Sequence, residues 1–549
     1  MVLNNSTDRA LTHEEKITRA ECYRAMAAAQ LGFSYDSSKN IPELFASMFP
    51  DSKVAADYAM KDRKLSYVVS HGTGSFFIRE LIKDVLKAPA YLLLFDETTI
   101  VGVRKQLDLH IRYWSEYQQG VVTRYWKSIM LVHATADIIS HHLLDSLKSE
   151  GLDLSKLLHL GRDNPNVNKA VEAMIEKEAR SAQEKKTGNS SNKGLLPIGP
   201  CPLHIIHTAF KRADEKPDSK LAIGEITRNE LQEMSTNEKI KFMQDVRDIY
   251  KTIARELTRT LPVTNKFLQN LQFMHPLQRH HESSSKSLMI IARDLPQLLS
   301  DDNLDYLNVE WRLYENETIP EEWYQQKTTS GDSDEVIKYQ PIDNYWKHVF
   351  AIKTSSGIAK FVVLPQLIKS LLSLSHGNTD VERGFSEHAA LITDNRSSLS
   401  DISINGLRAT KDAVKFLRTT KSSRRLLGNV KEAHSRYQVD QERKQRILKE
   451  KEAIEAAAKL TKNKELILVE KEQNLIDQRK ILQQDLENAS KMLNEGKSRL
   501  EAAVATKNFA GVEMAQLLIG GANKKLDALK AQLGDNTDQM NQLRKKLKK

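Results

Sequence analysis

Cysteine is scarce in this 549-residue sequence, which holds only Cys22 and Cys201, far apart along the chain. No disulfide framework follows from two such residues, so we expect a reducing compartment, the cytosol or the nucleus. No stretch approaches the roughly eighteen uninterrupted apolar residues of a membrane-spanning helix. Residues 1–30 carry charges throughout and lack a long apolar core, so we expect no signal peptide either.

A large excess of one charge is also lacking. The sequence has 82 Lys and Arg against 72 Asp and Glu, a formal net charge of +10. A basic balance permits a polyanionic partner such as DNA but does not require one. Because the two signs are interspersed, solvated helix faces explain the charges equally well.

Hydrophobic patterning predicts a strand-rich segment inside a mostly helical chain. The apolar run 91–95 fits a buried strand, and residues 106–114 and 121–133 fit two further strands, so we expect a three-stranded meander. Residues 157–160 form another short apolar run. The remainder of the chain has helical patterning, apart from two polar segments that we expect to be loops or interruptions: 181–193 and 328–335.

Three carboxylates stand where a metal site could form. Asp96 directly follows the apolar run 91–95, Asp163 follows the run 157–160, and Glu382 lies near the start of a predicted helix. Converging carboxylates can hold two divalent metals, which activate the attacking oxygen and stabilise the leaving oxygen in phosphoryl transfer. Mg²⁺ suits such oxygen ligands. Taken singly, each acid is more often a turn former or a helix cap.

Five short blocks add context to these acids, and they stand in one order within residues 40–420. They are Phe95–Thr99 with Leu109–Tyr113, Gly161–Asn168, Cys201–His207, Val309–Arg312, and Asp380–Ser386 with Asn395–Leu399. In this order they resemble the blocks of hAT transposases. The last one resembles the family's C-terminal block, often called the hAT dimerisation region.

The resemblance implies an α/β RNase-H-like catalytic core interrupted by a large all-α insertion. It maps Asp96, Asp163 and Glu382 onto the family's three acidic positions, which would bind Mg²⁺ or Mn²⁺ and cleave and transfer DNA strands in the nucleus. It also makes Trp311 and Arg383 candidates for DNA contact, with Trp311 stacking on a flipped base. The alternative for Trp311 is a core aromatic. The alternative for the whole chain is a domesticated, non-catalytic protein that binds DNA or protein partners and dimerises.

These expectations divide the chain into five parts. They are an N-terminal helical region (1–88), the first part of the RNase-H-like core (89–210), the helical insertion (211–363), the C-terminal part of the core with the dimerisation region (364–430), and a coiled-coil tail (437–549).

Zinc ligands are few. Cys201, His204 and His207 could supply three, but a structural site needs four and the sequence offers no evident fourth, so we do not expect structural zinc. The alternative is a buried cysteine beside packed histidines. The sequence also holds no Cys-x-x-Cys with paired histidines, so it lacks the zinc-binding BED finger with which the family usually starts.

The tail lacks Trp and Pro and is rich in Lys, Glu, Gln, Leu and Ala. Its seven-residue apolar spacing predicts a coiled coil, and two series carry it: Ile447, Ile454, Leu468, Leu475, Leu482, interrupted at Thr461, and Leu526, Leu533, Met540, Leu547. We expect either one rod or an antiparallel hairpin folded back at Gly511 or at Gly520-Gly521, pairing with itself or with a partner. We expect the main homo-oligomer contact around residues 382–417.

Overall fold

The computed structural model describes most of the chain, and the fold below refers to these residues. They are 10–100, 104–163, 166–188, 194–196, 198, 234–262, 264–329, 335–375, 377, 379–391, 399–418 and 423–547. They are mostly helical, with a small mixed sheet and a long C-terminal helix. The chain divides into two compact units, Met1–Tyr437 and Gln438–Lys549. None of the described helices has both the length and the apolar character that crossing a membrane requires.

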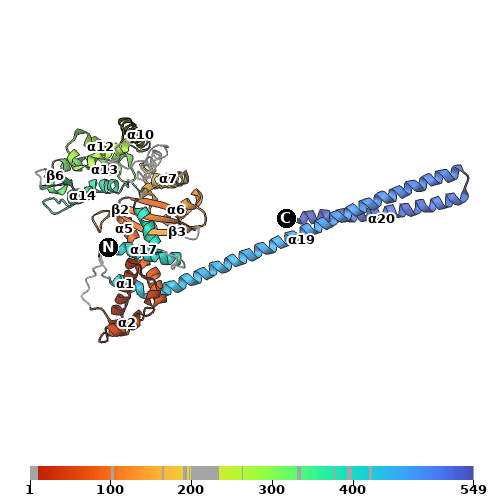
Figure 1. Cartoon of the computed structure of the whole chain (residues 1–549), viewed down its shortest axis with the longest axis horizontal. Helices are drawn as coiled ribbons and strands as arrows, with labels where there is room; N and C mark the ends of the chain where they lie inside the picture. Colours follow the sequence, from red (N-terminus) through yellow and green to blue (C-terminus); the bar gives the residue numbers. More distant parts are fainter. Residues whose placement is uncertain are drawn as a thin grey trace. The chain divides into compact units, whose positions relative to one another are not determined.

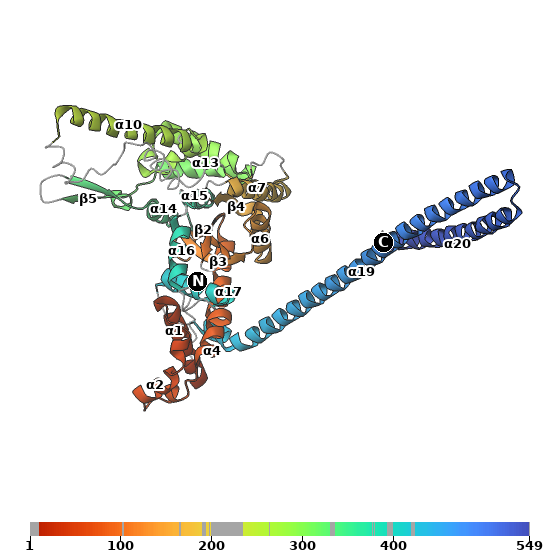
Figure 2. The same ribbon diagram turned by 45° about the vertical axis from the view of Figure 1, so that its right-hand side comes forward.

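A four-stranded sheet forms the centre of the first unit (Figure 2). Its strands are β1 (Tyr91–Ile100), β2 (Arg104–Ser115), β3 (Gly120–Leu131) and β4 (Leu157–Gly161). They stand in the order β3-β2-β1-β4, with β1, β2 and β3 antiparallel and β4 parallel to β1. The meander expected from the alternating apolar residues is therefore confirmed.

One face of the sheet is covered by helices close to it in sequence. Tyr91, Leu93 and Phe95 of β1 belong to a fully buried cluster on this face. The covering elements are α5 (Ser75–Lys87), α6 (Ala136–Ser149), η3 (Leu154–Lys156) and α7 (Asn166–Thr187). The expectation of a loop from residue 181 is wrong as far as Thr187, because α7 continues there and buries Gln183.

The other face packs against the helical insertion. Leu92 and Trp114 share one buried cluster with the insertion's Trp311 and Trp346. Its helical elements are α10 (Thr236–Thr260), α11 (Lys266–Asn270), η4 (Leu271–Met274), η5 (Pro276–Gln278), α12 (Glu282–Asp294), α13 (Asp301–Glu315), η6 (Glu321–Trp323) and α14 (Ile342–Phe350), followed by α15 (Leu364–Leu372).

The insertion is not entirely helical, which corrects the expectation from its patterning. Strands β5 (Gln325–Thr329) and β6 (Glu335–Tyr339) pair as a separate antiparallel two-stranded sheet. Of the polar segment 328–335, Thr328 and Thr329 lie in β5 and Glu335 begins β6, and the other residues lie outside the described ones. Backbone hydrogen bonds hold this sheet together, so it needs little of the apolar alternation that identifies a strand in a sequence.

A third core joins the two ends of the first unit. The N-terminal elements pack with helices from the C-terminal part of the expected core. They are α1 (His13–Leu31), η1 (Asp36–Ser38), α2 (Ile41–Met48), α3 (Lys53–Ala56), α4 (Asp62–Tyr67) and the π-helical turn η2 (Val68–Gly74), with α17 (Asp401–Leu417) and α18 (Arg424–Lys431). The helical patterning of the N-terminal region therefore does not form one continuous helix here, but the separate elements α3, α4 and η2.

Two glycines allow the closest approach in this third core. A Cβ built on Gly406 would lie 2.7 Å from the Cα of Ser70, and a Cβ on Gly74 would collide with the backbone of Gly406. Beside them, the hydroxyls of Thr73 and Thr410 are 2.8 Å apart and hydrogen-bonded. The η2 and α17 backbones therefore touch, which only glycine permits.

The packing of α17 also bears on the expected dimer contact at residues 382–417. Ile404, Leu407, Val414 and Leu417 are buried within the chain itself, three of them in the third core. A second copy would have to use other parts of this region.

The second unit is an antiparallel helical hairpin (Figure 1). The long helix α19 (Ala433–Ala505) turns at residues 506–508 into α20 (Phe509–Leu547). Lys507, at φ 50°, makes the turn, so the expectation of a turn at Gly511 or at Gly520-Gly521 is wrong. Of the two forms expected for the tail, the hairpin is the one observed.

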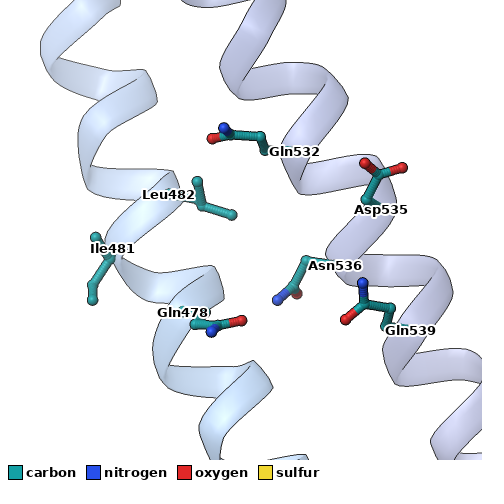
Figure 3. A pocket seen from close by; sticks show the side chains of 7 residues that line it. All are labelled: Gln478, Ile481, Leu482, Gln532, Asp535, Asn536 and Gln539. Atoms are coloured by element: carbon teal, nitrogen blue, oxygen red, sulfur yellow. The ribbon is translucent and has the colours of Figure 1, made fainter.

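The hairpin seam contains a buried polar residue. Asn536 of α20 is 5 % exposed, and its Nδ2 donates to the carbonyl oxygen of Leu475 at 3.1 Å, while its Oδ1 has no hydrogen-bond partner among the described residues. Figure 3 shows Asn536 facing α19 beside Leu482 and Gln478, around a cavity of about 330 Å³. Leu526 and Leu529 pack against Ala489 farther along. A single polar residue in an apolar seam fixes the register of paired helices.

Candidate functional site

Two of the three predicted acids are positioned by neighbouring parallel strands. Leu94 of β1 pairs with Gly161 of β4. Asp96 and Asp163 each stand two residues beyond this pair, Asp96 within β1 and Asp163 in the segment that follows β4. In neighbouring parallel strands, residues at the same distance beyond a register pair lie beside each other, although β1 itself continues past Asp96 to Ile100. The two carboxylates are therefore neighbours because of the strand register.

The third acid reaches the same edge from a helix. Glu382 lies in the first turn of α16 (Thr379–Leu391), and α16 packs against β1 and β2. Asp163 and Glu382 each bury one carboxylate oxygen. The structure thus brings Asp96, Asp163 and Glu382, which are up to 286 residues apart in sequence (382 − 96), into one acidic neighbourhood.

The electrostatics of Asp96 reflect this neighbourhood. Its side chain is 8 % exposed, and its Oδ1 accepts a hydrogen bond of 2.8 Å from the backbone N–H of Glu97. Burial raises the pKa of Asp96 to about 7, and the negative charges of Asp163 and Glu382 add to the rise. The Glu97 N–H opposes it only in part. Near neutral pH the Asp96 carboxyl is therefore partly protonated, and a cation that binds to it would displace the proton.

The donor set fits a hard divalent cation in chemistry, since all three groups offer oxygen ligands. The geometry does not match it directly. In the part of the chain that the structure describes, no three or more His, Cys, Asp or Glu side chains are arranged so that they could hold a metal ion.

Arg162, next to Asp163 in sequence, is directed away from the acidic group. Its guanidinium forms an ion pair with Glu172 of α7, and its Nη1 donates to the backbone carbonyl oxygen of Asp163 at 2.9 Å. Glu172 balances the charge of Arg162. Arg162 also orders the backbone at Asp163.

Sequence analysis did not identify a buried ion pair that lies beneath α16. Arg408 of α17 donates through Nη1 to Oδ2 of Asp108 at 2.6 Å, and through Nη2 to the carbonyl oxygen of Gly384 at 3.1 Å. Burial alone would raise the pKa of Asp108, but Arg408, with hydrogen bonds from Ser128 and Gln106, lowers it below its ordinary value. Asp108 occupies a polar position of the alternation in β2, between Leu107 and Leu109, so the sequence pattern alone marks it as a solvent-facing residue.

Gly384 is also where α16 approaches this pair most closely. A Cβ at Gly384 would lie 2.7 Å from Nη2 of Arg408 and 3.0 Å from Cε1 of His110. His110 is buried against the same guanidinium, and its pKa is lowered to about 4, by burial first and by Arg408 second. A neutral imidazole and a small residue thus let the helix that carries Glu382 sit directly on the ion pair.

The two candidates for DNA contact have different surroundings. Trp311 is fully buried between Phe273 and Tyr314, and its Nε1 donates to Glu315 at 2.7 Å. A base cannot reach this ring in the structure, so Trp311 is a core aromatic, as its alternative interpretation had it. Arg383 is exposed and lies 3.6 Å from Asp380 of its own helix, so its guanidinium remains available to a phosphate.

The proposed zinc candidates Cys201, His204 and His207 lie outside the described residues. The other cysteine, Cys22, is buried in α1, where burial raises the pKa of its thiol far above the usual range. Such a thiol is an unreactive core residue.

Comparisons with known proteins add no name to this site: no protein-family model matches the sequence, and no curated protein matches it.

Proposed function

We propose that this protein is a hAT transposase-like enzyme in which Asp96, Asp163 and Glu382 form a DDE-type site for cation-dependent DNA cleavage and strand transfer. One observation carries the proposal. The strand register and α16 gather three acids that the sequence motifs had singled out independently, closely enough for two of them to raise the pKa of the third.

We also propose that the sheet is an RNase-H-like core. Three features support this: an antiparallel meander followed by a strand parallel to β1, helices on both faces, and an insertion between the second and the third acid. A DNA substrate agrees with the net charge of +10, and we propose that the protein acts in the nucleus. Arg383, exposed one residue from Glu382, is the proposed phosphate contact.

The chemistry of the chain's own residues follows from their surroundings. A bound Mg²⁺ or Mn²⁺ would supply polarisation of the scissile phosphate and a nucleophilic oxygen. Asp96 and Asp163, held on the rigid sheet edge, would fix the cation's position, and Glu382 on α16 would complete the set of ligands. Since Asp96 has a pKa of about 7, cation binding must release a proton from it below that pH.

The experiment is a nicking assay on supercoiled DNA with the full chain, in Mg²⁺, Mn²⁺ or EDTA. We expect cation-dependent nicking that is lost in Asp96→Asn, because this substitution keeps the shape but removes an anionic oxygen. Asp145→Asn is the matched control, since Asp145 is exposed on α6, away from the three acids. Nicking by Asp96→Asn at the native rate would refute the mechanism.

A second candidate function is a transposase-derived, non-catalytic protein that binds DNA or protein partners. The observation that favours it is the lack of a metal-ready arrangement among the described side chains. Absence of nicking by the native protein in either metal, together with cation-independent DNA binding, would establish this alternative.

A further inference from the structure

A cleft of about 380 Å³ opens at the end of β1 opposite to Asp96. Pro89, in its wall, precedes Asp96 by seven residues, which is about 23 Å of extended chain. The acids therefore take no part in the cleft. Its walls come from the end of α5 and the residues after it, the turn after β2, η3, α7, the insertion and α15. The lining residues are Lys87, Ala88, Pro89, Glu116, Lys156, Lys186, Gln297, Leu298, Val362, Pro365, Gln366 and Lys369.

Positive charge dominates this cleft. Four lysines line it against one carboxylate, and that carboxylate, Glu116, is already paired with Lys369 at 2.5 Å. Lys87 and Lys186 are exposed and form no ion pair within the described residues. The pKa of Lys156 is lowered, by burial first and by the charge of Lys186 second. The lysines thus repel one another, and an anion between them would relieve the repulsion.

The cleft also offers hydrogen-bond donors to a ligand. The ammonium of Lys156 donates to the carbonyl oxygens of Leu86 at 3.2 Å and Ala88 at 3.1 Å, which fixes its direction and leaves one of its three N–H groups. Gln297 is 6 % exposed, and its side-chain amide forms no hydrogen bond to any described residue. Because Gln297 lines the cleft, its side-chain amide can donate to a polar ligand there.

The N-terminus of α15, which lies beside the cleft, does not supply donors for an anion. Glu310 accepts hydrogen bonds from the backbone N–H groups of Val362, Val363 and Leu364 at the start of α15, so an internal carboxylate already caps that helix. Any anion that binds here is held by side chains.

We propose that this lysine cleft binds a phosphate group. The phosphate belongs either to the backbone of a DNA strand, which rests on the proposed function above, or to a free nucleotide. Lys156, fixed by two carbonyls, and the amide of Gln297 give the phosphate its position, while Lys87 and Lys186 close over it from the surface. Lysine suits this role as a mobile point charge.

The test uses the full chain in EDTA, so that its outcome is independent of cleavage. The main variant is Lys87→Gln/Lys186→Gln, because both side chains are exposed and the fold does not need them. Lys156→Gln is the second variant, and Lys286→Gln, exposed on α12 outside the cleft, is the matched control. Affinity for a labelled DNA duplex is measured by fluorescence anisotropy over a series of salt concentrations, and affinity for ATP and inorganic phosphate by calorimetry.

If the cleft holds DNA, the double variant binds the duplex about tenfold more weakly and its log K against log salt slope becomes less steep by about two, since each lost phosphate contact removes roughly 0.9. Lys286→Gln keeps the native slope. If the cleft holds a free nucleotide, the same variants lose ATP or phosphate binding and keep duplex binding. Native affinities for the duplex, ATP and phosphate in both cleft variants would overturn the proposal, whatever the nicking assay shows.

Discussion

Arg408 and Asp108 form an ion pair of 2.6 Å, with side chains 2 % and 0 % exposed, directly beneath the helix that carries Glu382. Removing either charge would destabilise the fold, because the free energy of burying an unpaired ion far exceeds the stabilisation that the pair contributes. The guanidinium also lies 4.1 Å over the ring of Tyr125. This network connects β2, α16 and α17. The same buried ion pair therefore contributes to the core and to the position of the helix that carries Glu382.

We therefore expect Arg408→Met to destabilise the first unit by about 3–5 kcal/mol, because it leaves the carboxylate of Asp108 buried and unbalanced. Asp108→Asn/Arg408→Met should recover most of this loss, since a neutral amide still bonds to Ser128. Urea unfolding of the full chain measures both. A double variant no more stable than Arg408→Met would contradict the assignment.

The contact between Gly406 and η2 leads to a second prediction. Gly406→Ala should lower the free energy of unfolding by about 1–3 kcal/mol or more, because its Cβ meets backbone that cannot rotate away. Gly428→Ala is the matched control: nothing lies within 4 Å of its Cβ in α18, so it should stabilise by about 0.5–1 kcal/mol. Thermal unfolding compares the two, and equal shifts would argue against backbone contact.

The raised pKa of Asp96 predicts a pH dependence of stability in EDTA. The folded carboxyl binds its proton more tightly than the unfolded one, so its contribution is fully present below about pH 3.8 and is lost as pH rises through about 7. One pKa unit corresponds to about 1.4 kcal/mol, which limits the effect to about 4 kcal/mol. Relative to Asp96→Asn, the native chain should lose stability across this range in urea titrations. Parallel pH profiles of the two proteins would show that Asp96 titrates normally.

The hairpin seam leads to a prediction about Asn536. Replacing it by Leu removes a buried oxygen that has no partner, so Asn536→Leu should raise the melting temperature of the tail while loosening its register. Asn541→Leu is the control, since Asn541 is exposed on α20. Circular dichroism follows melting in the full chain, and light scattering follows any new oligomer. A lower melting temperature in Asn536→Leu alone would mean that the Leu475 hydrogen bond outweighs the buried oxygen.

Local patterns allowed the sheet to be predicted because β1, β2 and β3 are adjacent in sequence, β1 contains an uninterrupted apolar run, and the apolar residues of β2 alternate with the strand period. The same runs placed Asp96 and Asp163 just after two apolar segments, but they did not show that β1 continues past Asp96 to Ile100. The tail's seven-residue spacing likewise indicated helices that need a partner.

Contacts between distant segments could not be predicted in this way. The sequence around Gly406 does not indicate that this residue contacts η2. The sequence around Asp108 likewise does not indicate that its ion-pair partner is Arg408, 300 residues away. The turn at Lys507 was missed because glycine was taken as the sign of a break. Gly520 and Gly521 lie within α20 with open space around them, and helix pairing outweighs their low helix propensity.

The central claim is that Asp96, Asp163 and Glu382 act together as a cation site, and Mn²⁺ binding tests it most directly. Free Mn²⁺ is measured by electron paramagnetic resonance in the presence of the full chain at about pH 8, above the pKa of Asp96. The account predicts saturable binding by the native protein and by Asp145→Asn, and its loss in Asp96→Asn. Equal Mn²⁺ binding by the native protein and Asp96→Asn, or none by the native protein, would contradict it.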